Sequence, residues 1–210
     1  MIYLLSDKPH ENVVNLPVLQ INYLRPRIPW ENYNNLIVTS AHALEALNAM
    51  EDQVWKEKNL FVVGDATAAK AEAMGAKVYY TASGYGEALA KEIIQRFPFG
   101  RYLYCRPREV AHDLAAMLRR SRINVEEIVV YETRCSDHIP KMDIQPGSVV
   151  IFTSPKIARC FLGNYEWDSS WHAVCIGKTT AKALPKTVAF HCPRNPLLEE
   201  AVALAVSLQN

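Results

Sequence analysis

Two kinds of turn that could bind an anion each occur twice along the chain. Thr39-Ser40 and Thr153-Ser154 both follow a short aliphatic run and precede a helical pattern. Gly64 and Gly177 both end a similar run, and a threonine follows each of them three residues later. The first N–H groups of a helix have no acceptor within the helix, and the helix dipole adds partial positive charge there. Such turns are suited to hold carboxylate or phosphate oxygens.

An internal repeat relates the two members of each kind. Residues 36–44 match residues 150–158 at an offset of 114, and residues 61–68 match residues 174–181 at an offset of 113. Each second motif is followed by the pattern of a small helix, a short strand, a turn and an amphipathic helix. This order predicts two duplicated halves. Any one turn alone could be an ordinary helix cap or tight turn, but their repetition favours a ligand.

We expect one polyanionic ligand to contact the hydroxyls, backbone and basic side chains of these and neighbouring turns. Glycine has no Cβ, so the backbone can approach a ligand closely. The expected contact residues are Thr39, Ser40, Ala41, Gly64, Thr67, Ser83, Gly84, Arg106, Thr153, Ser154, Pro155, Gly177, Lys178, Thr179 and Thr180.

The elements that must position these turns alternate between strand and helix, which predicts βα units and largely parallel sheets. The expected strands are 2–5, 36–39, 60–63, 77–81, 101–104, 127–133, 148–153, 172–176 and 187–190. Apolar residues recur between them at helical spacing. The stripes are Ala43, Leu44, Leu47 and Met50; Leu89, Ile93, Ile94 and Phe97; and Val110, Leu114, Met117 and Leu118, with a last helix at 197–208. Open α/β sheets bind ligands at the carboxyl ends of their strands, where the turns would lie.

The first crossover of the chain is unusually short. About ten residues separate the first strand from Leu16, whereas a parallel crossover needs a dozen or more residues and is usually helical. We therefore expect this crossover to lack its helix.

Composition excludes several classes of protein. The net charge is +1 and no basic run exceeds two residues, so the footprint of a nucleic-acid-binding protein is missing. No apolar run approaches the ~18 residues of a membrane span, and the N-terminus resembles a strand rather than a signal peptide. The five cysteines are scattered, which favours reduced thiols in a cytoplasmic protein over a disulfide framework or a zinc site.

Familiar catalytic motifs are missing or incomplete. Gly177-Lys178-Thr179 resembles the end of a phosphate-binding loop, but His172 occupies the position of the required first glycine. No dinucleotide fingerprint, nucleophile elbow or zinc-protease motif is present, and the six histidines are dispersed. We interpret the carboxylate pairs Glu126-Glu127 and Glu199-Glu200 as solvated faces.

Five segments together resemble the uroporphyrinogen-III synthase family of tetrapyrrole biosynthesis. They are 36–40 (LIVTS), 62–68 (VVGDATA), 129–133 (VVYET), 152–155 (FTSP) and 176–181 (IGKTTA). Each motif is loose, so the resemblance depends on the whole set and its order. It implies two similar α/β domains, flavodoxin-like and with mostly parallel sheets, joined by a two-stranded linker with the ligand cleft between them. Domain 1 would comprise 1–18 and 134–210, domain 2 would comprise 22–130, and the linker strands would be about 17–23 and 130–135, where we expect a mobile hinge.

The reaction that the resemblance implies is the cyclisation of hydroxymethylbilane to uroporphyrinogen III. The last pyrrole ring is inverted and water is lost, through an azafulvene and a spiro intermediate. No cofactor is needed. Every ring of this linear tetrapyrrole carries two carboxylates, so the substrate is a polyanion of the kind that the turns predict. Catalysis would come mainly from imposed conformation and from dipoles that stabilise developing charge. We expect a monomer with neither nucleic-acid nor membrane partners.

Tyr131 is the expected catalytic side chain, because it matches the tyrosine of the family's Val-Tyr-x-Thr motif. Its phenol could donate a hydrogen bond to the departing hydroxyl; the alternative is a packing role in a linker strand. Two departures from the family pattern are the short first crossover and Arg106-Pro107-Arg108, where a glycine is common. The second departure leaves open whether Arg106 binds a propionate or is an ordinary surface arginine.

Two other functions remain open at this point. A non-catalytic two-domain sensor of a carboxylate-rich small molecule would share the same turns. A duplicated flavodoxin-like module with a flavin is less favoured, because the first βα turn is poor in glycine and has no long phosphate loop.

Overall fold

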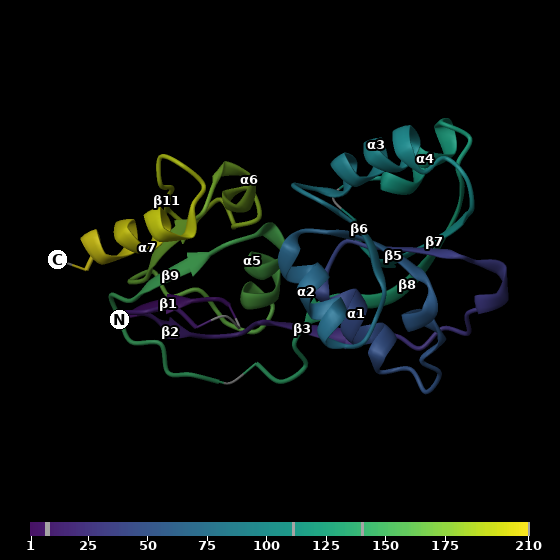
Figure 1. Ribbon diagram of the computed structural model, residues 1–210. Coiled ribbons are helices and arrows are strands. Elements are labelled where there is room, and N and C mark those ends of the chain that lie inside the picture. Colours follow the sequence, from purple (N-terminus) through teal and green to yellow (C-terminus); the bar gives the residue numbers. More distant parts are fainter. Residues whose placement is uncertain (7–8, 111, 140, 210) are drawn as a thin grey trace. The chain divides into compact units, whose positions relative to one another are not determined.

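The computed structural model describes residues 1–6, 9–110, 112–139 and 141–209. The chain folds into two compact units, each with its own β-sheet (Figure 1). Unit 1 comprises Met1–Gln20 and Arg134–Asn210, and unit 2 comprises Ile21–Thr133. Among the described residues, no helix is long and apolar enough to cross a membrane.

Unit 1 contains a five-stranded, wholly parallel sheet with the strand order β11-β10-β9-β1-β2. Its strands are β1 (Ile2–Leu4), β2 (Val14–Asn15), β9 (Val149–Phe152), β10 (His172–Cys175) and β11 (Phe190–His191). Its helices are α5 (Pro155–Leu162), α6 (Lys178–Ala181) and α7 (Leu198–Ser207).

Helices cover both faces of this sheet because its buried strands carry apolar side chains on both sides. Val150 and Phe152 face α5 and α6, whereas Val149 and Ile151 face α7. Figure 1 shows α7 and α5 on opposite sides of β9. The alternation of side chains along each strand produces this three-layer arrangement.

Unit 2 contains a six-stranded sheet with the order β3-β8-β7-β4-β5-β6. Its strands are β3 (Leu19–Tyr23), β4 (Asn35–Val38), β5 (Asn59–Val63), β6 (Val78–Ala82), β7 (Arg101–Pro107) and β8 (Asn124–Cys135). Its helices are η1 (Trp30–Asn32), α1 (Ala41–Asn48), η2 (Val54–Glu57), α2 (Asp65–Ala73), α3 (Gly86–Arg96) and α4 (Leu114–Arg120). Strands β4 to β8 are parallel.

Strand β3 runs antiparallel to β8. The Leu24 N–H donates to the Val130 carbonyl at 2.8 Å, and the Ser136 N–H donates to the Val18 carbonyl at 2.9 Å. Along the bonded pairs, residue numbers rise on β3 and fall on β8, as they do in an antiparallel pair. These two strands carry the chain from unit 1 into unit 2 and back.

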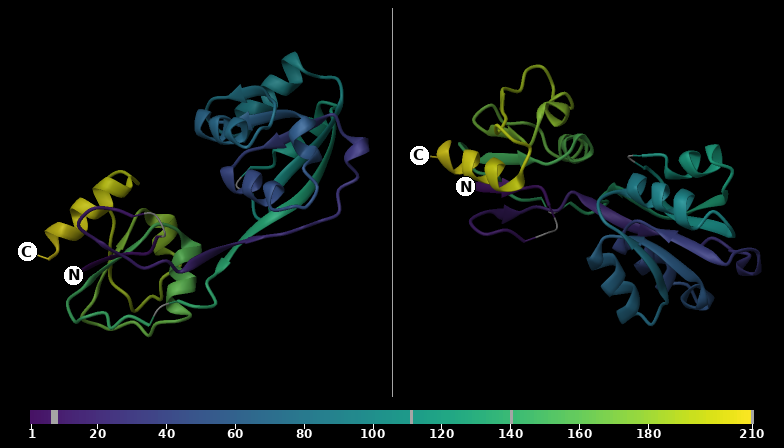
Figure 2. Two further views of the ribbon diagram at one scale, coloured as in Figure 1. Left: turned by 60° about the horizontal axis from the view of Figure 1, so that its bottom comes forward. Right: turned by 45° about the horizontal axis from the view of Figure 1, so that its top comes forward.

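The sheet of unit 2 also has a helical layer on each face (Figure 2, right). Val38 and Val62 pack with α1 and α2, whereas Ile37 and Phe61 pack with α3 and α4. The expected helical stripes on α1 and α3 supply Leu44 and Leu89 to these cores.

The structure confirms the α/β fold with mostly parallel sheets and corrects some details. The helix expected from Val110 begins at Leu114, because the Asp113 carboxylate caps it by accepting from the Ala116 N–H at 2.8 Å. Val110 lies outside it and is exposed. The described residues between β1 and β2 include no helix, in agreement with the short crossover. Glu127 lies in β8 rather than on a solvated face, and it is ion-paired.

The prediction of five reduced cysteines is wrong for one pair. Cys135, at the end of β8, and Cys160, in α5, form a disulfide with a Cα–Cα distance of 5.2 Å. The two cysteines are 25 residues apart, a spacing that matches no cysteine motif, so only the fold reveals that they are neighbours. Cys105, Cys175 and Cys192 are free thiols.

Candidate functional site

The predicted turns of unit 2 lie together at one edge of its sheet. In this parallel array, Val38 is paired with both Cys105 and Val62, and Val63 is paired with Ala82. The turns that follow β4, β5, β6 and β7 therefore leave the sheet side by side. They contain the predicted residues Thr39, Ser40, Gly64, Ser83 and Gly84. Ala41 and Thr67 lie in the first turns of α1 and α2, and Arg106 is near the end of β7.

The predicted turns of unit 1 are neighbours for the same reason. Phe152 of β9 is paired with Cys175 of β10, so the turns after these strands are adjacent. Thr153, Ser154 and Pro155 follow β9, and Gly177, Lys178, Thr179 and Thr180 follow β10.

The two serine turns are built alike. Ser40 and Ser154 are the N-caps of α1 and α5, and both have extended backbones. The Ser40 hydroxyl oxygen accepts from the His42 N–H, and the Ser154 oxygen accepts from the Ile157 N–H, each at 3.2 Å. The Ser40 carbonyl also accepts from the Ala43 N–H at 3.0 Å, and the Ser154 carbonyl accepts from the Ala158 N–H at 3.1 Å. Pro155 has no N–H, so what the start of α5 offers an anion is mainly the positive end of the helix dipole.

The two glycine turns share a hydrogen-bond pattern but differ in backbone conformation. The Gly64 carbonyl accepts from the N–H groups of the third and fourth residues after it, and so does the Gly177 carbonyl, at 3.0–3.2 Å. Gly64 has φ +80°, which favours glycine, whereas Gly177 is extended at φ −171°. Only the first turn requires glycine for its backbone.

The turns of unit 1 are more cationic than those of unit 2. Lys178 directly follows Gly177, but Asp65 occupies the same position after Gly64. Lys156 is the second residue of α5, where α1 of unit 2 has His42. Because Asp65 already places a carboxylate at the positive end of α2, the Gly64 turn is the least favourable of the four for an anionic ligand.

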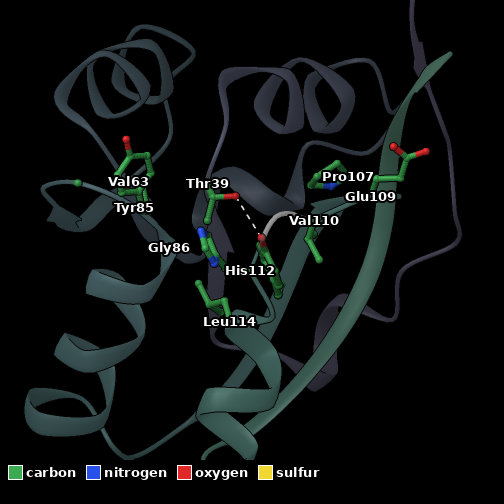
Figure 3. Close-up of a pocket in the computed structure, with 11 residues that line it drawn as sticks. Thr39, Val63, Tyr85, Gly86, Pro107, Glu109, Val110, His112 and Leu114 are labelled. Carbon is green, nitrogen blue, oxygen red and sulfur yellow. Dashed lines mark hydrogen bonds between the residues drawn. The ribbon is translucent and has the colours of Figure 1, made fainter. Parts of the chain in front are cut away.

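A pocket of about 250 Å³ opens near the carboxyl ends of the strands of unit 2 (Figure 3). Thr39 lies in it between Tyr85, on the side of α3, and Glu109, which follows β7. The Thr39 hydroxyl and the Tyr104 hydroxyl are hydrogen-bonded at 3.2 Å, the contact dashed in Figure 3. Burial raises the pKa of Tyr104, so this phenol stays protonated. Of the predicted residues, Thr39 and Gly84 line this pocket; the described lining residues are Thr39, Val63, Gly84, Tyr85, Gly86, Tyr104, Pro107, Glu109, Val110, His112 and Leu114.

Tyr131 is buried in β8, with only 6% of its surface exposed. Burial raises the pKa of its phenol, and a hydrogen bond with Ser40 opposes that rise in part. The predicted catalytic tyrosine is therefore in contact with a predicted ligand turn, 91 residues earlier in the chain (131 − 40). As a protonated phenol it can donate a hydrogen bond but does not release its proton at neutral pH.

Arg106 is occupied by contacts within unit 2. Its Nε lies 2.7 Å from Glu127 Oε1, and its Nη1 donates to the carbonyl of Pro107 at 2.8 Å. Arg119 Nη1 contacts the other oxygen of Glu127 at 2.8 Å. A substrate propionate would have to compete with Glu127 for this guanidinium.

The remaining predicted residues differ in exposure. Lys178 and Thr179 are exposed, and so are Ser83 and Gly84, whereas the Thr180 side chain is only 3% exposed. A ligand can reach the first four directly. Thr180 contributes to its turn through its N–H, which donates to Gly177.

Sequence reasoning missed the polar residues that surround Tyr131 and Thr39. His42, Glu45 and Tyr23 form a hydrogen-bonded cluster beside Tyr131. They come from separate segments with no motif, and the only available signal was that His42 directly follows the Thr39-Ser40 turn. Among the described residues, no group of three His, Cys, Asp or Glu side chains could hold a metal ion.

Known proteins share this sequence pattern and fold. Residues 8–192 match the family model described as uroporphyrinogen-III synthase HemD. The fold is similar to that of uroporphyrinogen-III synthetase from Helicobacter pylori 26695, with TM-score 0.75 and 24% sequence identity over 99% of this chain and 98% of that chain. A mutant uroporphyrinogen III synthase from Thermus thermophilus aligns with TM-score 0.49 and 10% identity over 99% of this chain and 97% of that chain. No curated protein matches the sequence.

Proposed function

The chain belongs to the uroporphyrinogen-III synthase family, and we propose that its own turns and side chains carry out the family reaction as follows. Hydroxymethylbilane is cyclised to uroporphyrinogen III, the last pyrrole ring is inverted, and water is lost. The observation that supports this most directly is the placement of Tyr131 against the Ser40 turn at the carboxyl edge of a parallel sheet.

The carboxylates of the substrate bind chiefly to the turns of unit 1. Helix α5 presents the positive end of its dipole after Ser154, and Lys178 adds positive charge beside Gly177. Charge-assisted hydrogen bonds of this kind are roughly twice as strong as neutral ones. Backbone donors also explain how a chain of net charge +1 can bind a substrate with two carboxylates on each ring.

The pocket of unit 2 holds one part of the substrate. Its volume of about 250 Å³ lies below the ~300–1,000 Å³ typical of sites for drug-sized ligands, so it accommodates a ring with its side chains rather than a whole tetrapyrrole. Glu109 in its lining would repel a substrate carboxylate but accept a hydrogen bond from a pyrrole N–H.

Tyr131 donates a hydrogen bond to the hydroxyl that leaves the first ring. Its raised pKa keeps the phenol protonated during this step. The rest of the rate enhancement comes from holding the linear substrate in a conformation from which the inverted last ring can close.

The decisive experiment generates hydroxymethylbilane in situ, adds the purified protein, oxidises the products and separates the uroporphyrin isomers. We expect isomer III to replace isomer I in proportion to the amount of protein, because an unassisted bilane closes without inversion. Formation of isomer I alone, with bilane still bound, would refute catalysis and leave a non-catalytic sensor of a carboxylate-rich molecule.

A further inference from the structure

Four titratable side chains gather beside Tyr131 in unit 2. His42 and Glu45 lie one turn apart on α1, Tyr23 is the last residue of β3, and Lys70 is on α2. All four belong to unit 2, as does Tyr131. The cluster therefore depends on the internal packing of one unit.

Glu45 is the centre of the cluster. One of its carboxylate oxygens lies 3.0 Å from His42 Nδ1 and accepts a hydrogen bond from the Tyr23 hydroxyl. The other oxygen is ion-paired with Lys70 Nζ. The hydrogen bond from Lys70, followed by that from Tyr23, lowers the pKa of Glu45 to about 2, so the carboxylate is ionised at neutral pH.

Glu45 fixes the orientation of the His42 ring. A carboxylate bonded to Nδ1 places a proton on that nitrogen. The Tyr23 hydroxyl lies 3.4 Å from the same nitrogen. No described residue is bonded to Nε2, and the His42 side chain is 43% exposed, so this nitrogen is available to a ligand.

The His42 ring also lies against the expected catalytic tyrosine. The ring centroids of His42 and Tyr131 are 5.7 Å apart, and the rings are tilted by 51°. A small polar group bound against one ring is therefore within reach of the other. The two residues differ in chemistry, because imidazole gains and loses a proton near neutral pH whereas a buried phenol does not.

We propose that His42, oriented by Glu45, is the proton donor to the hydroxyl that leaves hydroxymethylbilane; this inference rests on the proposed function. The C–O bond of the hydroxymethyl group breaks while electrons from the pyrrole nitrogen form the exocyclic C=C bond. The oxygen takes a proton from His42 Nε2 and leaves as water. The pyrrole N–H proton then passes to the neutral imidazole, which restores the starting state.

The groups that face His42 set the pH dependence of this step. They are Glu45 on the same helix, Tyr23 from β3 and Tyr131 from β8, with Lys70 acting through Glu45. The step requires protonated His42, so kcat falls as the pH rises and the imidazolium loses its proton. Removing the Glu45 carboxylate takes away the acceptor bonded to Nδ1, so the orientation of the His42 ring is no longer fixed.

The test compares the pH profiles of kcat for isomer III formation in the parent protein and in two variants. His42→Gln should lower kcat about a hundredfold, the lower end of the usual range for general acid–base catalysis, and abolish the alkaline fall. Glu45→Gln should also lower kcat and leave KM within about threefold, because the amide no longer fixes the orientation and the Nδ1 proton of the His42 ring. His172→Gln is the matched control, because His172 is an exposed histidine at the amino-terminal end of β10. The predicted ligand turns follow the carboxyl ends of the strands instead.

The outcomes separate this inference from the proposed function. If the parent protein forms only isomer I, the proposed function fails. If the parent forms isomer III and His42→Gln retains kcat within about threefold, or retains the alkaline fall, His42 is not the proton donor. If His42→Gln unfolds, Glu45→Gln decides the question: a lower kcat with KM unchanged supports the role of His42, and an unchanged kcat refutes it.

Discussion

Tyr131 and Tyr102 are both buried phenols of unit 2 with a hydrogen-bond partner, but only Tyr131 contacts a turn that we predict to bind ligand. Tyr102 donates to the Phe97 carbonyl at 2.7 Å. Tyr131 is bonded with Ser40. Their similar burial, at 1% and 6% exposed, makes them a matched pair for separating a catalytic role from a structural one.

Tyr131→Phe should lower kcat for isomer III roughly a hundredfold, the lower end of the usual effect of losing one donor to a developing charge. Both Tyr131→Phe and Tyr102→Phe should lower the free energy of unfolding by about 1 kcal/mol, because each loses one buried hydrogen bond. Urea unfolding and the isomer assay measure the two effects. Equal kcat values for both variants would assign Tyr131 a packing role alone.

The sequence predicted single residues well where a local pattern defined them. Ser40 and Ser154 follow a strand and open a helix, so their capping role could be read from neighbouring residues. The contact between His42 and Tyr131 could not, because 89 positions separate them (131 − 42) and the contact depends on the β8-β7-β4 strand order. The Arg106–Glu127 ion pair depends in the same way on the pairing of β7 with β8.

At the scale of the elements, the two glycine turns occupy equivalent places but make different demands on their glycine. Gly64 has φ +80° and ψ 142°, a region that residues with a side chain rarely adopt. Gly177 is extended, and an added Cβ would lie 3.8 Å from the Pro196 Cβ, an ordinary contact.

The same substitution should therefore have unequal effects in the two repeats. Gly64→Ala should lower the free energy of unfolding by about 1–3 kcal/mol, the usual cost of a strained backbone. Gly177→Ala should change it by less than about 0.5 kcal/mol. Thermal and urea unfolding of both variants against the parent measure the difference. Equal losses of stability would show that the repeats constrain their glycines alike.

Elements could be predicted as far as local periodicity extends. The strands and helices of both repeats follow from alternating apolar runs, stripes and cap residues, and the structure places them within a few residues of the expected bounds. The disulfide between the end of β8 and α5 could not be predicted, since it depends on how two distant segments pack. The start of α4 was misplaced because Val110 continues the apolar spacing, whereas Asp113 provides the cap.

At the scale of the whole molecule, the chain consists of two units that share an architecture but differ in the residues of their turns. Both units are three-layer α/β structures in which a serine turn and a glycine turn end neighbouring strands. Unit 1 carries lysines in these turns, and unit 2 carries His42 and Asp65. Our proposals accordingly assign carboxylate binding to unit 1 and proton transfer to unit 2.

Unit 2 is continuous in sequence, so this division of tasks can be tested by expressing residues 21–133 alone. The fragment retains all six strands of its sheet at least in part, and it retains the apolar cores on both faces. Its 113 residues (133 − 21 + 1) are within the usual size of an independent domain. We expect a cooperative thermal transition by circular dichroism, because the residues of both cores are present.

The folded fragment should nevertheless form no isomer III. It keeps Tyr131 and the His42–Glu45 pair but lacks the turns at Ser154 and Gly177 that bind the carboxylates in our proposal. The intact chain assayed at the same concentration is the control. A folded fragment that forms isomer III would show that the turns of unit 1 are dispensable, and the carboxylates would then have to be held by unit 2 alone.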